Sequence, residues 1–236
     1  MQLTPDTATP SRSSPVARAQ LRDEAAAFIR ELIVSGQAAP GTLLRLGPLA
    51  EQVAASTTPV REALLLLAQD GWVVQEPHRG FRVAPIKRDD VDDSYFVQSF
   101  VAGELAARAA EQPTEEAIAE LRRLDAEIAR LNVRHNYRHV DDLNYRLHAV
   151  IYELADSPRL VWFVQAASRF VPRRFWVTIP GWLEHNRAEH GPVIDAVEAR
   201  DSDRARELMA AHIRLAGALL VAHLGSVSFW DQSDDR

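Results

Sequence analysis

The stretch LAEQVAASTTPVREALLLLAQDGWVVQEPHRGFRV, residues 49–83, decides the fold of the first third of the chain. Its middle predicts a helix, because Ser56 or Thr57 can cap a helix N-terminus and Pro59 is tolerated in a first helical turn. Glycine disfavours a helix interior, so we expect this helix to end at Gly71. The stretch therefore predicts a capped helix with a defined beginning and end.

Short elements surround this helix on both sides. Apolar residues at helical spacing predict a helix over 17–34, and a second, short helix is expected at about 48–54. Two β segments are expected at 72–75 and 81–84, joined by a turn that contains proline and glycine. A helix, a short helix, a capped helix and a two-stranded ribbon make a winged helix-turn-helix. We expect this DNA-binding domain to span residues 16–86.

These residues resemble the DNA-binding half of the GntR family of bacterial regulators. The similarity covers roughly 17–86, and the core Thr-Pro-Val-Arg-Glu-Ala-Leu at 58–64 matches the family motif identically. A helix N-terminus rich in hydroxyl groups can donate hydrogen bonds to phosphate, and one arginine can bind guanine through two hydrogen bonds. The resemblance implies that Ser56, Thr57, Thr58 and Arg61 face the major groove or its phosphates, and that His78 or Arg79 of the wing reaches the minor groove. Arg45 is a further DNA-binding candidate.

Two positions depart from the family pattern. Thr57 stands where the family usually has arginine, and Gly47 stands where some members carry another DNA-contacting arginine. Arg45 lies two residues earlier, and the sequence leaves open whether it compensates. Residues 15–85 also carry seven arginines against seven acids. Fewer cationic contacts lower the DNA affinity and its dependence on salt, so we expect an operator different from that of typical members.

Bulk composition bounds the class of protein. The chain has 236 residues, of which 47% are hydrophobic and 25% charged, values typical of globular proteins and sufficient for two domains. Cysteine is absent, which excludes disulfides and thiol chemistry and leaves the eight histidines as the softest metal ligands. The net charge of −6 gives no general affinity for nucleic acid, so DNA binding depends on local geometry.

The two ends of the chain are predicted to be flexible. Residues 1–15 are rich in proline, serine and threonine and lack the apolar run of a secretory signal, so we interpret them as an arm. Residues 225–236 are interpreted as a tail. The apolar run at 216–222 is too short to span a bilayer, so we expect a cytoplasmic protein without membrane contact.

The remainder of the chain is predicted to be almost entirely helical. Proline, glycine and Asp-Ser pairs interrupt the helical periodicity at regular intervals. Long helices joined by short links form an antiparallel bundle, so the predicted fold class is mainly α: an N-terminal winged helix-turn-helix followed by an all-helical domain at 89–224. The expected helices are 89–111, 114–132, 137–156, 158–179, 182–200 and 202–224.

Three stretches of this second domain carry a second resemblance: NYRLHAVIYELADSPRL, EHGPVIDAVEARD and ARELMAAHI. They resemble the FCD ligand-binding domain of the FadR-type branch of the GntR family, in which many members bind a divalent metal. The resemblance implies the ligands Asn144, His148, His190 and His212. The first two are four residues apart and share a helix face. Three imidazoles and one oxygen suit Zn²⁺ or Ni²⁺.

The ligand of this domain is expected to be a small carboxylate. Asn144 is a weaker ligand than the carboxylate of many relatives, so either the metal affinity is lower or an anionic effector supplies the missing charge. Many relatives hold an acidic effector with an arginine where this chain has Phe100, and aromatic side chains are expected in the pocket wall. The basic residues that can replace that arginine are Arg146, Arg169, Arg173 and Arg174, and we take the first three as effector-binding candidates.

Taken together, these patterns predict a ligand-responsive transcriptional repressor of a nearby metabolic operon. One short helix reads only a few base pairs, so we expect a homodimer on two half-sites. One alternative is a metal-dependent hydrolase with a metal-activated water. The sequence lacks a His-Glu-x-x-His run, however, and an enzyme leaves the winged helix unexplained. The other alternative is a degenerate regulator whose helical domain only dimerises.

Overall fold

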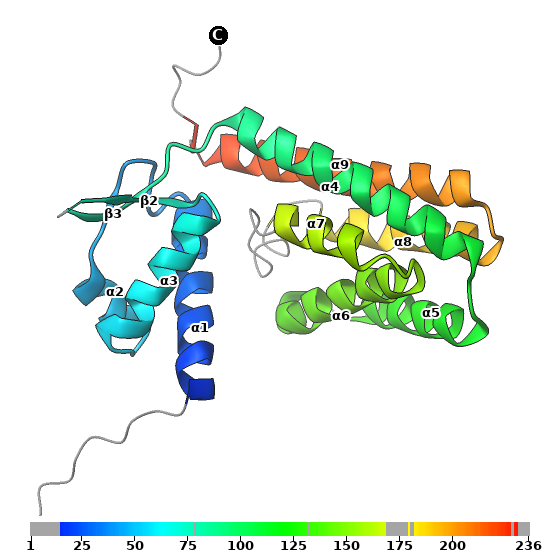
Figure 1. Ribbon diagram of the computed structural model, residues 1–236, viewed down its shortest axis with the longest axis horizontal. Coiled ribbons are helices and arrows are strands. Elements are labelled where there is room, and N and C mark those ends of the chain that lie inside the picture. Colours follow the sequence, from blue (N-terminus) through cyan, green and yellow to red (C-terminus); the bar gives the residue numbers. More distant parts are fainter. Residues whose placement is uncertain are drawn as a thin grey trace, which may run out of the picture.

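The computed structural model describes residues 15–77, 79–131, 133–168, 179, 182–227 and 229–230. Within these residues the chain forms a small mixed unit followed by a purely helical one, which lie side by side (Figure 1). The predicted fold class is therefore confirmed. The predicted arm at 1–15 lies outside the described residues except for Pro15, which begins the first helix.

The first unit packs three helices against a small antiparallel sheet. The strand order is β1-β3-β2, and Phe81 of the central strand lies opposite Leu44 on one side and Gln75 on the other. The sequence analysis missed β1, because a strand of two residues is too short to show alternation. The elements are α1 (Pro15–Val34), β1 (Leu43–Leu44), α2 (Leu46–Gln52), α3 (Thr57–Gln69), β2 (Val73–Glu76) and β3 (Gly80–Val83).

One face of α3 holds this unit together. Val60, Ala63, Leu64 and Leu67 are fully buried, at the i, i+3, i+4, i+7 spacing of an amphipathic helix, and they pack against α1. The helix ends at Gln69 with Asp70 as its C-cap, two residues before the predicted end, and Gly71 follows with a positive φ of 81° that suits the left-handed position after a C-cap. Because this face is buried, the opposite face of α3 points toward solvent.

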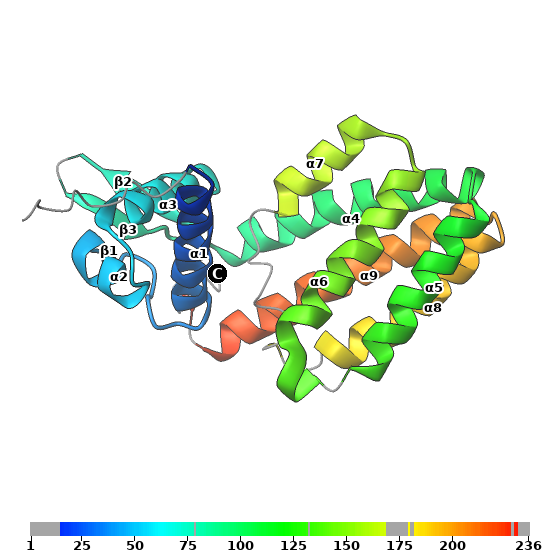
Figure 2. The ribbon, with the colours of Figure 1, turned by 90° about the horizontal axis from the view of Figure 1, so that it is seen from below.

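The second unit stacks its helices in three tiers. Figure 1 shows α4 and α9 at the top, α5 and α6 at the bottom, and α7 and α8 between them; Figure 2 shows the same helices from below. The predicted helices are present with boundaries shifted by a few residues, and the part predicted at 169–178 lies outside the described residues. The helices are α4 (Arg88–Glu111), α5 (Glu115–Arg130), α6 (Val133–Leu154), α7 (Pro158–Ser168), α8 (Trp182–Glu198) and α9 (Ser202–Ser226).

Close contact between α4 and α9 depends on glycine. A Cβ atom added to Gly217 of α9 would lie 2.5 Å from Cγ of Tyr95 on α4. A Cβ added to Gly103 of α4 would lie 2.9 Å from the backbone oxygen of Arg206 on α9. The two helix backbones therefore approach too closely for a larger residue at either position.

Helix α9 is the most apolar element of the chain. Among the described residues it is the one helix that is long and apolar enough to cross a membrane by length and composition. Its apolar stretch is therefore longer than the run at 216–222 on which the prediction was based. In the structure, 44% of the apolar window is buried. The helix packs against α4 and α8, which gives its apolar side chains a place in a protein core.

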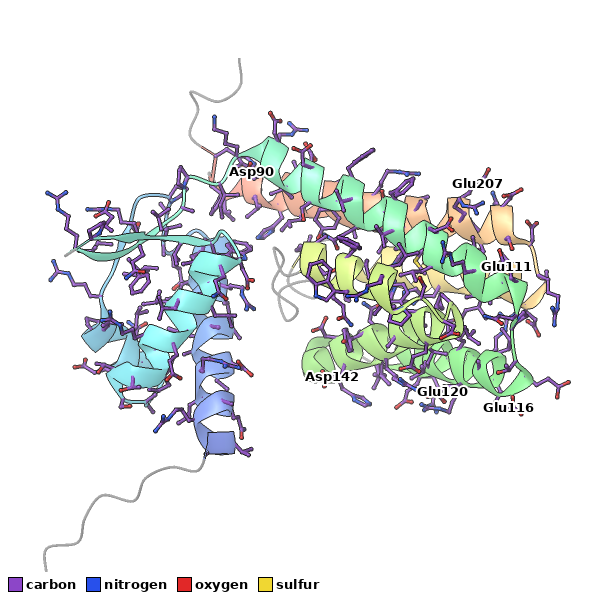
Figure 3. The ribbon with its side chains drawn as sticks, viewed as in Figure 1. Asp90, Glu111, Glu116, Glu120, Asp142 and Glu207 are labelled. Carbon is purple, nitrogen blue, oxygen red and sulfur yellow. The ribbon has the colours of Figure 1, made fainter. Side chains whose placement is uncertain are left out.

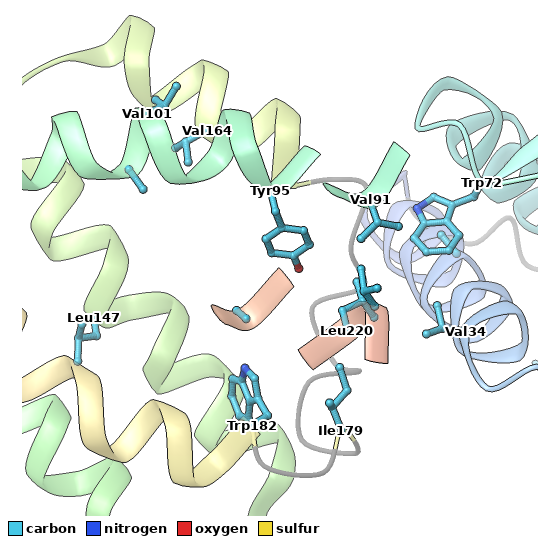
Figure 4. Packing of buried hydrophobic residues seen from close by; sticks show 14 of the residues in the cluster. Val34, Trp72, Val91, Tyr95, Val101, Leu147, Val164, Ile179, Trp182 and Leu220 are labelled. Atoms are coloured by element: carbon cyan, nitrogen blue, oxygen red, sulfur yellow. The ribbon is translucent and has the colours of Figure 1, made fainter. Parts of the chain in front are cut away.

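The two units share buried apolar contacts. Val34 of α1 and Trp72, which precedes β2, lie beside Val91 of α4 and Leu220 of α9 (Figure 4). The residues after α9 also pack: Phe229 is buried, and its ring meets Trp230 edge to face. Packed chain thus extends into the range 225–236, for which a flexible tail was predicted.

Candidate DNA-binding surface and metal centre

The exposed side of α3 begins with a row of polar side chains. Ser56 is the N-cap residue, with extended backbone, and its side chain makes no capping hydrogen bond. Ser56, Thr57, Thr58 and Arg61 are all exposed. The first turn of a helix has backbone N–H groups without intrahelical partners, and these attract anions such as phosphate. The helix start can therefore approach DNA through both its backbone and its hydroxyl groups.

The remaining cations of the first unit fall into two kinds. Arg79, at the turn between β2 and β3, and Arg45, before α2, are exposed like Arg61. Arg82 of β3 is engaged instead: its Nε donates to Oε1 of Glu76 at 2.8 Å, and its guanidinium also donates to the backbone oxygen of Gly41 at 2.8 Å. Arg82 therefore braces the base of the wing. His78 lies outside the described residues.

Charge is divided unequally between the two units. Residues 15–85 carry equal numbers of arginines and acids, so the net charge of −6 belongs to the rest of the chain. The six acidic residues labelled in Figure 3 all lie on the helical unit. Acidic charge on that unit keeps it away from a polyanion, so a DNA contact favours the first unit alone.

Three histidines from three different helices meet inside the second unit. His148 on α6, His190 on α8 and His212 on α9 each offer a ligand nitrogen, and the three nitrogens all lie within 4.8 Å of one another. The Nε2 atoms of His148 and His212 are 3.3 Å apart. Two nitrogens held 2.1 Å from one tetrahedral ion are about 3.4 Å apart, so this pair fits a shared divalent metal.

The protonation state also suits metal binding. His190 and His212 are buried, with only 1% and 3% of their surfaces exposed. Burial, with a smaller contribution from His212, lowers the pKa of His148 to about 3, so this imidazole is neutral at pH 7. Its Nδ1 is buried without a hydrogen-bond partner among the described residues. Metal ions bind neutral imidazoles, so the donor set fits the implied metal.

Two carboxylates lie beside the histidines, and neither was predicted from the sequence. Oε2 of Glu189 lies 3.4 Å from Nδ1 of His212, and Oδ1 of Asp125 lies 3.9 Å from Nδ1 of His190. Burial raises the pKa of the Asp125 carboxyl. Asp125 is far from the histidines in sequence, and Glu189 carries no spacing signal of its own, so only the packing of α5, α8 and α9 reveals these pairs.

The fourth predicted ligand lies on the expected helix. Asn144 is half-buried on α6, one turn before His148. That position agrees with an oxygen ligand, and ligation by Asn144 stays a prediction. His139 lies apart from the cluster at the surface, where its Nε2 is 3.2 Å from Oε1 of half-buried Glu127.

The effector-binding candidates are less well placed. Arg146 lies on α6, two residues after Asn144, and is exposed. Its guanidinium donates a hydrogen bond to Oε1 of Glu153 at 2.8 Å. Arg169 and Arg173 lie outside the described residues. Phe100 is 72% exposed on α4, so it faces solvent and does not line a pocket. The expectation of an aromatic pocket wall is wrong for this residue.

A shallow depression of about 350 Å³ lies between α6 and α7. Its lining includes Tyr152, Val161 and Trp162. The Tyr152 ring centroid is 6.0 Å from that of His148. Tyr152 therefore contributes to the lining of the depression and also lies near one histidine of the candidate metal centre.

Two family models match the chain, and together they cover most of it. Residues 21–83 match the model described as "Bacterial regulatory proteins, gntR family", and residues 93–215 match the FCD domain. The two matches are separated by residues 84–92, which form the connector and the first turn of α4. FCD domains often bind metals, in agreement with the histidine cluster.

Curated relatives and solved structures agree with the family models. The chain is 28% identical over 200 residues to the uncharacterised HTH-type transcriptional regulator Rv0043c of Mycobacterium tuberculosis, covering 80% of this chain and 79% of the relative. It is 26% identical over 193 residues to the transcriptional repressor RspR of Escherichia coli, covering 79% and 83%. The structure of E. coli McbR/YncC has the same fold, with a TM-score of 0.63, 24% identity, and coverage of 85% and 96%.

Proposed function

This chain belongs to the GntR family of bacterial regulatory proteins and carries an FCD domain, and we propose that it is a homodimeric repressor controlled by a small effector at a metal centre. Its curated relatives are named as HTH-type transcriptional regulators. The observation that carries the proposal is the pairing, in one chain, of an exposed polar helix start with three converging histidines, of which His190 and His212 are buried and His148 is half-buried.

In this proposal α3 enters the major groove. Ser56, Thr57 and Thr58 bind phosphates and fix the register, while Arg61 contacts a base. The wing, with His78 and Arg79, reaches the minor groove, and Arg45 adds a phosphate contact. The exposure of Arg45, Arg61 and Arg79 supports these roles, since none of the three forms an ion pair with another described residue.

The metal centre is the proposed sensor. His148, His190 and His212 hold Zn²⁺ or Ni²⁺, with Asn144 as the oxygen donor, and coordination positions left by the protein stay open to a ligand. A bound divalent ion supplies a positive charge that anchors the carboxylate of a small effector. Three histidines kept at ligand geometry favour this sensor over a degenerate domain that only dimerises.

Dimerisation is proposed to use an aromatic surface on α4 and α7. Phe96, Phe100, Trp162 and Phe163 are each more than half exposed, and α4 packs directly on α7. Exposed aromatic side chains in neighbouring helices are typical of protein interfaces. A dimer brings two copies of α3 to two half-sites of an operator. We place the protein in the cytoplasm, where bacterial DNA lies.

The proposal is tested by binding to DNA from the region flanking the gene. Fluorescence anisotropy with the full chain, at two salt concentrations, is expected to give a saturable complex of two chains per operator. Adding the cognate carboxylate to metal-loaded protein is expected to weaken that complex, because effector and DNA favour different arrangements of the two units. Absence of binding to every flanking fragment at low salt contradicts the proposal.

A further inference from the structure

We propose that Glu189 and Asp125 are positioning residues of the metal centre. Glu189 orients His212, and Asp125 orients His190, while their two negative charges offset the charge of a divalent ion. This inference rests on the proposed metal centre and deepens it, because it says which of this chain's residues set the metal affinity. The two carboxylates then supply the negative charge that the neutral side chain of Asn144 does not.

The geometry of Glu189 carries most of the inference. Glu189 and His190 are consecutive on α8, so their side chains project about 100° apart around the helix and serve different neighbours. His190 turns into the cluster, whereas Glu189 contacts α9, with its Oε2 buried and 3.4 Å from Nδ1 of His212. The Nε2 of His212 is the atom that faces His148. The carboxylate therefore stands on the side of the ring away from the metal.

Asp125 repeats the arrangement from the other side, at a longer distance. It lies on α5, with 26% of its side chain exposed, and its Oδ1 is 3.9 Å from Nδ1 of His190. That separation exceeds a hydrogen bond, so its effect on His190 is mainly electrostatic. Nearby Arg122 forms its ion pairs with Asp195 and Glu198, both at 2.6 Å. Because Asp125 is farther from its histidine than Glu189 is, we expect its removal to lower the metal affinity less than removal of Glu189.

The chemistry of imidazole explains why the carboxylates matter. A carboxylate that accepts a hydrogen bond from Nδ1–H fixes the tautomer in which Nε2 carries the lone pair, and it makes Nε2 a stronger donor. Two nearby negative charges also balance a divalent cation inside a bundle of low polarity. Both effects act before any effector arrives. The metal is then a resident part of the sensor, and an anionic effector is needed for the response and not for metal loading.

The test compares metal affinities of the full chain. Zn²⁺ binding is measured by competition with a chromophoric chelator for the wild type, Glu189→Gln, Glu189→Asp and Asp125→Asn. The matched control is Glu207→Gln, an exposed acid of α9 (Figure 3). Loss of an outer-sphere partner typically weakens metal affinity roughly 10- to 100-fold. We expect that range for Glu189→Gln, partial recovery in Glu189→Asp, a smaller loss for Asp125→Asn, and no change in the control.

A second readout separates positioning from simple structural support. Long-range ¹H–¹⁵N NMR of the metal-free wild type reports which nitrogen of His212 carries the proton, and we expect Nδ1–H in the wild type and a tautomer mixture in Glu189→Gln. This measurement on the wild type decides the proposal even where a variant unfolds. A wild-type His212 protonated on Nε2, or a Glu189→Gln affinity within twofold of wild type, overturns the inference and leaves the metal centre standing. A wild type that binds no Zn²⁺ overturns the metal centre itself, and this inference with it.

Discussion

The two units of this protein present their functional residues in opposite ways. The first unit places Ser56, Thr57, Thr58 and Arg61 on one exposed turn, adjacent in sequence and open to solvent. The second unit gathers its histidines from three helices into a cluster inside the fold, and two of them, His148 and His212, are 64 residues apart in sequence.

The difference follows from what each unit is proposed to bind. A DNA duplex is too large to enter the fold, so the residues of the protein that contact it lie on an outer surface. A metal ion is smaller than a side chain and needs donors from several directions, so its ligands must converge inside the fold. The first arrangement tolerates changes in packing, whereas the second depends on it.

The largest expected effect is loss of the metal by His212→Ala. Removing one of three converging imidazoles leaves an incomplete donor set, so we expect Zn²⁺ affinity to fall by more than the roughly 100-fold that outer-sphere changes produce. Binding of the metal-free protein to operator DNA is expected to stay within twofold of wild type. His139→Ala, a surface histidine, serves as the control in chelator competition. Equal losses in both variants contradict a specific centre.

The converse change is Arg61→Ala in the first unit. One specific base contact is worth roughly 1–3 kcal/mol, so operator affinity is expected to fall about 5- to 150-fold while Zn²⁺ affinity stays constant. Fluorescence anisotropy measures the first quantity and chelator competition the second. Arg123→Ala, an exposed arginine on α5, is the matched control, and it should change neither. An Arg61→Ala protein with wild-type operator affinity would remove this residue from the interface.

Packing sensitivity of the second unit is tested by Gly217→Ala. The new Cβ would lie 2.5 Å from Tyr95 Cγ, so α4 and α9 must move apart at a cost of about 1–3 kcal/mol. Because α9 also carries His212, we expect a lower Tm together with weaker Zn²⁺ binding. Gly191→Ala is the control: nothing lies within 4 Å of its added Cβ, and alanine in a helix gains about 0.5–1 kcal/mol over glycine. A Gly217→Ala protein as stable as wild type contradicts the close approach.

The smallest expected effect is a gain, from Gly47→Arg and Thr57→Arg. A Cβ added at Gly47 meets nothing within 4 Å, and Gly47 and Thr57 are both exposed, so we expect both arginines to be accommodated at the surface. Each new phosphate contact is expected to raise the affinity at low salt and to steepen the log–log salt dependence by about 0.9. Binding isotherms at several salt concentrations measure the slope. An unchanged slope shows that the two positions do not face DNA.

Much of the fold was predictable because its signals are local. The helix at α3 and its end near Gly71 follow from capping residues, proline and glycine within one short stretch. Its N-cap residue is Ser56, one of the two predicted candidates, but the Ser56 side chain makes no capping hydrogen bond. The two-residue strand β1 was missed because its only cause is pairing with β3, far along the chain.

The sequence by itself determined the two domains, because their helices and strands have local signals. Its motifs resemble those of one family, and that resemblance implied the three histidines. Only the tertiary structure decided what surrounds those histidines. It placed Glu189 beside His212 and Asp125 near His190, and it turned Phe100 outward to solvent. These contacts join helices that are distant in sequence. They follow from how the helices pack, and helix packing depends on all the side chains of the core at once.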